Sequence, residues 1–151
     1  MAHAEAPKWS LRPAEQADFD WAYELHKAAL GEYVEKTWGW DEDAQQRMFA
    51  DGFCREARQV IEVGGQAVGV LVVEERSDEL HLGLIELLPA WQGRGLGTDI
   101  LRCLLRRARE THLPLTLHVL RANPRAVALY ERVGLRVVGS EPVRLLMRSG
   151  A

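Results

Sequence analysis

Residues 91–98 read WQGRGLGT and carry a glycine at every second position, Gly93, Gly95 and Gly97. A run rich in Leu and Ile precedes this stretch, and a segment with helical periodicity follows it. The first N–H groups of a helix have no partner inside the helix, and they lie at the positive end of its dipole. Where side chains are absent, an anion can touch that backbone, and Arg94 would add a full charge nearby. The stretch therefore predicts a strand-to-helix turn that holds a pyrophosphate.

Three other interpretations of the glycine stretch compete with this one. The dinucleotide-binding fingerprint needs G-x-G-x-x-G and an acid about 20 residues further on, whereas this stretch has G-x-G-x-G and no suitable acid near position 115. The Walker pattern ends in Gly-Lys-Ser/Thr, which is absent here. A loop that only turns tightly remains open as a purely structural alternative.

The composition fits one soluble globular domain over residues 1–151. Hydrophobic residues make up 47% and charged residues 27%, which is ordinary for such a domain. The net charge of −3 and the pI of about 6.0 argue against a nucleic-acid partner bound through its phosphates. Small ligands remain open.

Nothing in the sequence predicts export or a membrane partner. The first ten residues, MAHAEAPKWS, lack a basic segment followed by an apolar one, and no stretch approaches the ~18 apolar residues that span a bilayer. Cys54 and Cys103 lack metal-ligand spacing, and we expect both to be buried free thiols. These features favour a reducing cytoplasm and no bound metal.

Hydrophobic periodicity predicts a mixed order of strands and helices. A first strand ends near Arg12, and a helix from Ala17 to about Leu30 is closed by Gly31. Further strands are expected at 59–63, 67–75, 79–88, 115–120, 135–139 and 143–147, and further helices at 43–53, from Thr98, and from Asn123 to Gly134. Such an order predicts one α/β domain with a central strand–helix–strand crossover.

Two motifs resemble those of the GCN5-related N-acetyltransferase (GNAT) family. Gln92, Gly95 and Gly97 fit the acetyl-CoA signature Q-x-x-G-x-G, and the strand LHLGLIELLP stands before them. Residues 123–135, NPRAVALYERVGL, are similar to the second signature N-x-x-A-x-x-L-Y-x-x-x-G-F and depart from it only at Leu135. The resemblance covers residues 60–148, and the N-terminal third agrees only in its order of elements.

The resemblance implies a GNAT-type α/β fold: a mixed, mostly antiparallel sheet of six to seven strands, about four helices and a splayed central pair of parallel strands. It also implies acetyl-CoA as co-substrate. The pyrophosphate would lie on backbone N–H groups of Gly93, Arg94, Gly95, Leu96, Gly97 and Thr98, with Gln92 steadying the turn. The pantetheine arm would run beside Leu87 and Leu88, at a bulge before Pro89, and contact Asn123 and Tyr130.

Two catalytic groups follow from the same resemblance. The N–H of Leu87 is the candidate oxyanion donor. Tyr130 matches the tyrosine that gives its proton to the leaving sulfur, and a phenol with a pKa near 10 is close to a thiol near 8.5. Alternatively, Tyr130 simply packs on the core, and Asn123 simply caps its helix.

The general base stays open at this stage. An ammonium has a pKa of about 10.4, so a group or a water must remove its proton. His81 lies where some family members place a basic residue, and Glu86 is an acid in an apolar run, which is costly to bury without purpose. Alternatively, His81 is only a partly exposed strand residue, and Glu86 lies at a bulge or on the surface.

Residues 31–43, GEYVEKTWGWDED, suggest where the acceptor binds. Acids and tryptophans attract amines through ion pairs and cation–π contacts, and the family has a variable substrate loop here. The candidate substrate residues are Glu35, Trp38, Trp40 and Asp41. In the competing interpretation, the tryptophans anchor the loop and the acids cap the next helix.

We therefore expect a cytoplasmic N-acetyltransferase that catalyses direct attack of a small-molecule or peptide amine on acetyl-CoA. The resemblance also allows a homodimer. We interpret the arginines of helix 98–110 as a solvated face. The sequence contains no nucleophile-elbow motif, so it gives no support for a hydrolase. The alternatives are a CoA-binding module without turnover and a dinucleotide-binding oxidoreductase.

Overall fold

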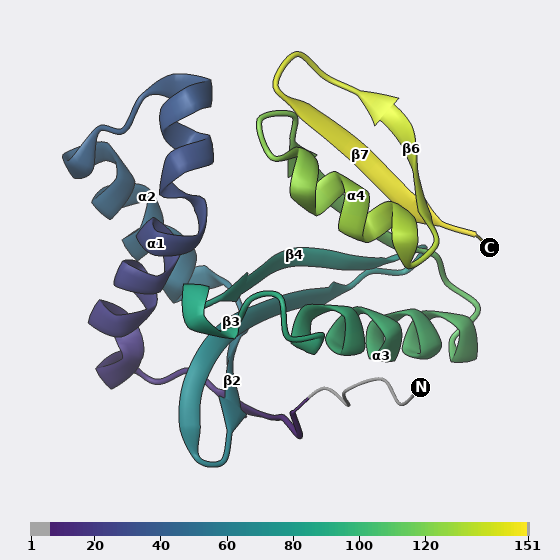
Figure 1. Cartoon of the computed structure of the whole chain (residues 1–151), viewed down its shortest axis with the longest axis horizontal. Coiled ribbons are helices and arrows are strands. Elements are labelled where there is room, and N and C mark those ends of the chain that lie inside the picture. The colour runs from purple at the N-terminus through teal and green to yellow at the C-terminus, as the bar shows by residue number, and fades with distance from the viewer. Residues whose placement is uncertain (1–6, 151) are drawn as a thin grey trace.

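The computed structural model describes residues 7–150, which contain one seven-stranded sheet. The strand order is β1-β2-β3-β4-β5-β7-β6, and every neighbouring pair is antiparallel except β4 and β5 (Figure 1). The strands are β1 (Ser10–Pro13), β2 (Arg58–Val63), β3 (Gln66–Glu75), β4 (Leu80–Leu87), β5 (Leu115–Leu120), β6 (Leu135–Ser140) and β7 (Arg144–Ser149). This confirms the predicted fold class.

Four α-helices in the described residues cover the sheet. They are α1 (Phe19–Trp38), α2 (Glu42–Arg55), α3 (Leu96–Glu110) and α4 (Pro124–Arg132). α1 and α2 lie together at one side of the sheet, and α3 connects the parallel pair β4 and β5 (Figure 1). No helix in the described range is long and apolar enough to cross a membrane.

Two apolar clusters hold these layers together. The larger one joins the buried face of α3, including Ile100 and Leu104, to β4, β5 and the partly buried side of α4. The smaller one joins α1 and α2 to the other side of β3 through residues such as Leu25, Phe49 and Val70. A periodic apolar face on each helix is thus buried against the sheet, as helical spacing requires.

The parallel pair separates partway along its length. β4 and β5 are paired only at Leu80–Leu115, His81–Thr116 and Leu82–Leu117, although both strands continue beyond these residues. The register of β3 against β4 shifts at this point, because Val72 faces Leu84 and Val73 faces Leu82. Gly83 is therefore an extra residue in β4, and a bulge of this kind bends a strand away from its neighbour. The bulge lies four residues before the predicted place at Leu87.

The structure corrects three further expectations. α1 does not end at Gly31 but continues to Trp38, where Gly39 with φ of +80° ends it. The cost of a glycine inside a helix is about 1 kcal/mol, and burial of Val34 in the following turn offsets it. α3 begins at Leu96, two residues before Thr98. Both cysteines are free, but Cys54 is exposed, so its predicted burial is wrong.

Candidate active site

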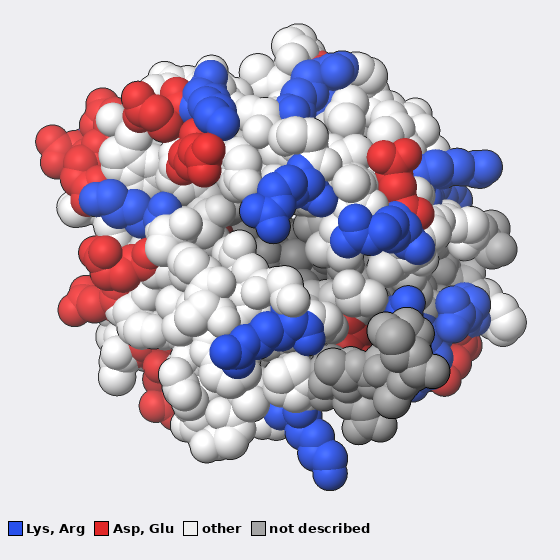
Figure 2. Space-filling model, viewed as in Figure 1, with Lys and Arg blue, Asp and Glu red and all other residues white. Residues whose placement is uncertain are grey.

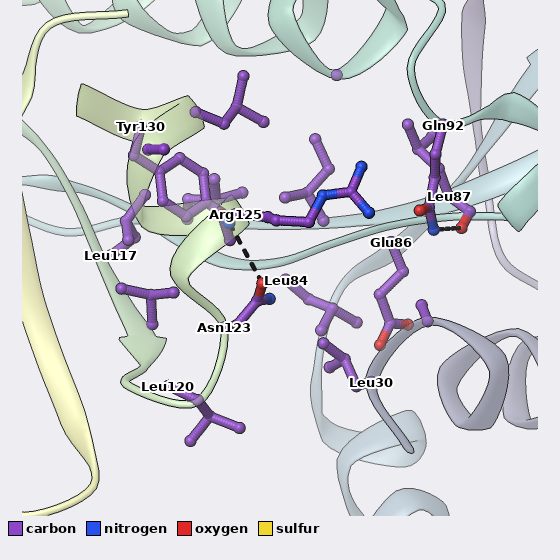
Figure 3. A pocket seen from close by; sticks show the side chains of 18 of the residues that line it. Leu30, Leu84, Glu86, Leu87, Gln92, Leu117, Leu120, Asn123, Arg125 and Tyr130 are labelled. Atoms are coloured by element: carbon purple, nitrogen blue, oxygen red, sulfur yellow. Dashed lines mark hydrogen bonds between the residues drawn. The ribbon is translucent and has the colours of Figure 1, made fainter. Parts of the chain in front are cut away.

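The separated strands open a cleft of about 560 Å³. Its walls come from the second half of α1, the end of β4, the glycine turn, the end of β5 and one side of α4 (Figure 3). The cleft thus lies where β4 and β5 stop pairing, and their edges face it instead of each other. Edges without a strand partner can bind an extended ligand in place of a strand.

The glycine turn at one end of the cleft exposes several backbone N–H groups. Gly93 and Gly95 have φ of +74° and +82°, a conformation that favours glycine. Gly95 is the N-cap of α3 and provides no side-chain cap. Within the described residues, the N–H groups of residues 96–98 have no hydrogen-bond partner, while the next one, of Asp99, bonds to the Gly95 carbonyl. Unpaired N–H groups at the positive end of a helix are suited to binding an anion.

The surroundings of Gly97 explain why the turn contains a third glycine. It is helical, and a Cβ there would be 3.8 Å from Leu87 Cδ1 and 4.0 Å from Leu129 Cδ2, which are ordinary contacts. Neither the backbone nor the packing therefore requires glycine. Because Gly97 lines the cleft, the missing side chain leaves space for a ligand.

The predicted cofactor residues divide into two groups. Residues lining the cleft are Leu87, Gln92, Gly93, Gly95, Gly97, Thr98, Asn123 and Tyr130. Leu88, Arg94 and Leu96 are not among them. The guanidinium of Arg94 lies 4.6 Å from the Trp91 ring centroid, and Leu96 is fully buried in the core.

Backbone geometry separates Leu87 from Leu88. The Leu88 N–H donates to the Val68 carbonyl at 2.9 Å, so it is already used. Successive N–H groups of a strand point to opposite edges, which directs the Leu87 N–H away from β3 and toward the cleft. The Leu87 carbonyl accepts a hydrogen bond from Gln92 Nε2 at 3.0 Å, so Gln92 holds the strand end against the turn.

On the opposite wall, α4 carries Asn123 and Tyr130. Asn123 Oδ1 accepts from the Ala126 N–H at 3.2 Å, so the predicted helix cap is present. Tyr130 lines the cleft and also packs against the larger apolar cluster. Both the structural and the functional interpretations of these residues are therefore compatible with the geometry.

Burial raises the pKa of Tyr130 to about 12. The phenol therefore keeps its proton throughout the physiological range. Full transfer to a thiolate whose acid has a pKa near 8.5 would therefore be uphill. The environment favours Tyr130 as a hydrogen-bond donor to a developing thiolate over a group that gives its proton away completely.

Glu86 is a buried acid at the other end of the cleft. Its side chain has no exposed surface, and its Oε2 lies 2.7 Å from Nδ1 of His26 on α1. Its Oε1 has no hydrogen-bond partner within the described residues. An unpaired carboxylate oxygen is costly to bury, which makes a ligand or a held water the expected partner.

His81 lies outside the cleft. It is buried on β4, where Nδ1 contacts the Thr116 hydroxyl at 2.8 Å, and its ring packs edge-on against His118. Burial is the main cause that lowers the pKa of His81. His81 lies where β4 still pairs with β5, opposite Thr116, whereas Glu86 lies beyond the point where the two strands separate and lines the cleft.

The four predicted substrate residues also lie outside the lining of the cleft. Glu35 Oε2 accepts from the Trp40 N–H at 2.6 Å, and Asp41 caps α2 by accepting from the Ala44 N–H. Trp40 packs against the smaller cluster, and Trp38 is 61% exposed at the end of α1. The expected loop is mostly helix, and the geometry favours the structural alternative for these residues.

Sequence reasoning missed several residues that line the cleft. α1 contributes Ala29, Leu30 and Tyr33, and Figure 3 shows the side chain of Arg125 extending from α4 into the cleft. Arg125 follows Asn123-Pro124 directly, so its place in the second motif could have indicated it. The α1 residues carry no local signal, because only the packing of α1 against β4 brings them here.

Comparison with known proteins agrees with this geometry. The sequence model of the Acetyltransferase (GNAT) family matches residues 16–135. The chain belongs to the GNAT acetyltransferase family. The match includes α1, the glycine turn and α4, and so extends the motif resemblance into the N-terminal third. No curated protein sequence matches the chain.

Solved GNAT structures share the fold at low identity. PaiA N-acetyltransferase from Thermoplasma acidophilum, in complex with coenzyme A, has a TM-score of 0.74 and 11% identity, with 95% of this chain and 99% of that one covered. The ribosomal-protein-S18-alanine N-acetyltransferase from Escherichia coli has a TM-score of 0.66 and 20% identity, with 95% of this chain and 96% of that one covered. A spermidine N-acetyltransferase SpeG chimera from Vibrio cholerae and hSSAT has a TM-score of 0.65 and 24% identity, with 93% of this chain and 94% of that one covered. These likenesses show the GNAT fold.

Among the described residues, no group of three or more His, Cys, Asp or Glu side chains could hold a metal ion.

Proposed function

We propose that the protein is an N-acetyltransferase that transfers the acetyl group of acetyl-CoA to a primary amine of a small molecule or peptide. One observation carries the proposal: the separation of β4 from β5 opens directly beside the unpaired N–H groups of the glycine turn. A nucleotide thioester needs both features, an anion site for its diphosphate and a slot for its extended arm. Related folds determined with coenzyme A or acetyl-CoA bound support it.

The cleft residues fit this co-substrate. The N–H groups of residues 96–98 would take the diphosphate, and Arg125 and Arg132 line the same cleft from α4. Arginine binds phosphate strongly through several N–H donors. The free edge at Leu87 and the amide of Asn123 would hold the pantetheine arm between the strands.

Each step of the transfer has a residue in reach of the cleft. The amine nitrogen forms a bond to the thioester carbonyl carbon, and the carbon–sulfur bond then breaks. The Leu87 N–H would stabilise the oxyanion, Tyr130 would donate a hydrogen bond to the departing sulfur, and Glu86 would take the proton of the amine. Neither cysteine lines the cleft, which favours direct attack over an acylated enzyme.

The proposal includes a cytoplasmic location and a homodimer. The exposed free thiol of Cys54 suits a reducing compartment. β6 has an unpaired edge at the end of the sheet and exposes Val137 and Val138, 43% and 46%, and such an edge is a place where two copies can pair. Cell fractionation and analytical ultracentrifugation test these two points.

The experiment that tests the function measures coenzyme A binding by calorimetry and thiol release from acetyl-CoA with a panel of primary amines. We expect binding and amine-dependent thiol release. Binding without release by any amine would identify a CoA-binding module instead. Stabilisation by NADH but not by acetyl-CoA would identify a dinucleotide-binding protein.

A further inference from the structure

The charged side chains of the cleft are divided by sign along its length. Glu86 is the single acidic residue among the described residues that line it, whereas Arg125 and Arg132 line the end near α4. Figure 2 shows Lys and Arg side chains around the hollow at the centre of this face, with Asp and Glu gathered over α1 and α2. The part of the cleft at Glu86, where the acceptor amine would bind, is called the acceptor end. It holds one negative charge.

That charge is fixed in position and incompletely satisfied. His26 holds Oε2 of Glu86 at 2.7 Å, and the side chain is closed off from bulk solvent. Oε1 has no partner within the described residues. Oε1 therefore has acceptor capacity left for an N–H donor of a ligand.

The walls around the carboxylate are apolar. Leu30 from α1 and Leu84 from β4 lie beside Glu86 in the view of Figure 3, and both line the cleft. None of these side chains can pair with a second charge. A charged group placed against them would lose its hydration without compensation.

Four acids of α1, α2 and the segment between them already have partners. Glu32 pairs with Lys36 at 3.0 Å, and Glu42 pairs with Lys27 and accepts from the Trp40 indole N–H. Glu35 and Asp41 accept backbone N–H groups around the start of α2. These contacts leave the acidic surface of α1 and α2 less able to hold a second ammonium than its composition suggests.

From these observations we infer that the acceptor is a primary monoamine with an apolar substituent next to its amino group, and that Glu86 recognises its single ammonium. This inference rests on the proposed function and narrows its substrate class. An acceptor with a second ammonium on the same arm would place that charge against Leu30 or Leu84.

A matched pair of amines tests the inference. Pentylamine and 1,5-diaminopentane have the same chain length and differ by one distal ammonium. We expect kcat/KM for pentylamine to be at least tenfold higher at pH 8, with acetyl-CoA saturating and thiol release as the readout. Equal values, or a preference for the diamine, would overturn the inference and leave the proposed function standing.

A pair of variants makes the test independent of the wild-type ratio. Leu30→Glu adds a second carboxylate to the apolar wall, and Leu30→Gln adds similar bulk without charge. Glutamate and glutamine are both good helix formers, so α1 should persist in each variant. Circular dichroism verifies this. We expect Leu30→Glu to move the diamine-to-monoamine ratio of kcat/KM upward at least fivefold and Leu30→Gln to leave it within twofold.

The remaining outcomes are also decisive. A folded Leu30→Glu variant with an unchanged ratio would show that charge at this wall does not select the acceptor. Reaction with other amines but with neither member of the pair would overturn the inference as well. No thiol release with any amine would contradict the proposed function itself.

Discussion

The imidazole of His26 and the carboxylate of Glu86 form a contact of 2.7 Å between α1 and β4, across 60 positions of sequence. His26 also packs against Phe49 and Trp40, with ring centroids 5.4 and 6.5 Å away. The pair thus ties the acceptor end of the cleft to the packing of α1 on α2. It places a structural contact and a proposed catalytic group in one unit.

Replacing His26 should separate these two roles. His26→Phe removes the N–H that Glu86 accepts, and loss of a hydrogen bond to a charged group costs about 1.5–3 kcal/mol. We expect kcat/KM to fall roughly 10- to 100-fold, since Glu86 is no longer held in place. His26→Asn, whose amide nitrogen can occupy nearly the same position as Nδ1, should recover most of the activity. Steady-state kinetics with urea unfolding of both variants is the measurement; equal losses in the two would contradict a positioning role.

Tyr130→Phe tests the hydrogen bond to the departing sulfur. We expect kcat to fall about 10- to 100-fold, the value of a hydrogen bond to a charged group, with the Kd for coenzyme A within threefold of wild type. Because burial raises the pKa of Tyr130 to about 12, its ionisation should not shape the pH–rate profile between pH 6 and 10. The variant profile should therefore be a scaled copy of the wild-type profile. A change in kcat of less than threefold would mean that Tyr130 only packs on the core.

Two glycines of the turn should respond differently to alanine. Gly97→Ala introduces a methyl group that meets only ordinary contacts in the protein, and alanine favours a helix over glycine by about 1 kcal/mol. We expect equal or higher thermal stability but at least tenfold weaker coenzyme A binding, because the methyl group enters the cleft. In Gly93→Ala, the alanine would have to adopt the φ of +74° that Gly93 has. This should lower the free energy of unfolding by about 1 kcal/mol. Calorimetry and thermal unfolding check both; unchanged binding by Gly97→Ala would show that no ligand approaches this backbone.

Acid stability should depend on Asp18. Hydrogen bonds from Arg12 at 2.8 and 2.9 Å hold the pKa of Asp18 below its ordinary value. The folded pKa lies below the unfolded one, so the stabilisation is present above about pH 4 and is lost as the pH falls through the folded pKa. Asp18→Asn keeps an acceptor for the Glu15 N–H but removes the charge.

We therefore expect the Asn variant to be less stable than wild type at pH 7, and this difference to shrink as the pH falls below about 4 and through the folded pKa of Asp18. Urea unfolding from pH 3 to 7 measures this difference. Asp78→Asn, in an exposed turn, is the control and should follow the wild-type curve. A difference between Asp18→Asn and wild type that does not change with pH would refute the assignment.

Local patterns were enough for most of the fold and for the part of the cleft that the two motifs line. Alternating and helical spacing located all seven strands and the four helices, and the glycine turn, the Asn123 cap and Tyr130 lie where their motifs placed them. These features depend on neighbouring residues alone, since caps, positive φ values and amphipathic faces are properties of a few consecutive positions.

The rest of the site was misplaced for a physical reason. The composition of residues 31–43 suggested a substrate loop, but packing of Val34 extends α1 through it, and the cleft receives Ala29, Leu30 and Tyr33 instead. His26 was not singled out, because its partner is distant in sequence. His81 and Glu86 were both candidates for the base, and only the point where β4 leaves β5 separates them. His81 still faces Thr116 of β5, whereas Glu86 lies beyond that point and lines the cleft.

The sequence by itself thus determined the elements, their order and the position of the glycine turn, because short-range sterics and hydrogen bonding act within each segment. Only the tertiary structure decided where β4 leaves β5, which helix closes the acceptor end and which acid is buried there. Those outcomes depend on the competition among long-range contacts for the same surfaces, and residue spacing along the chain does not record which contact wins.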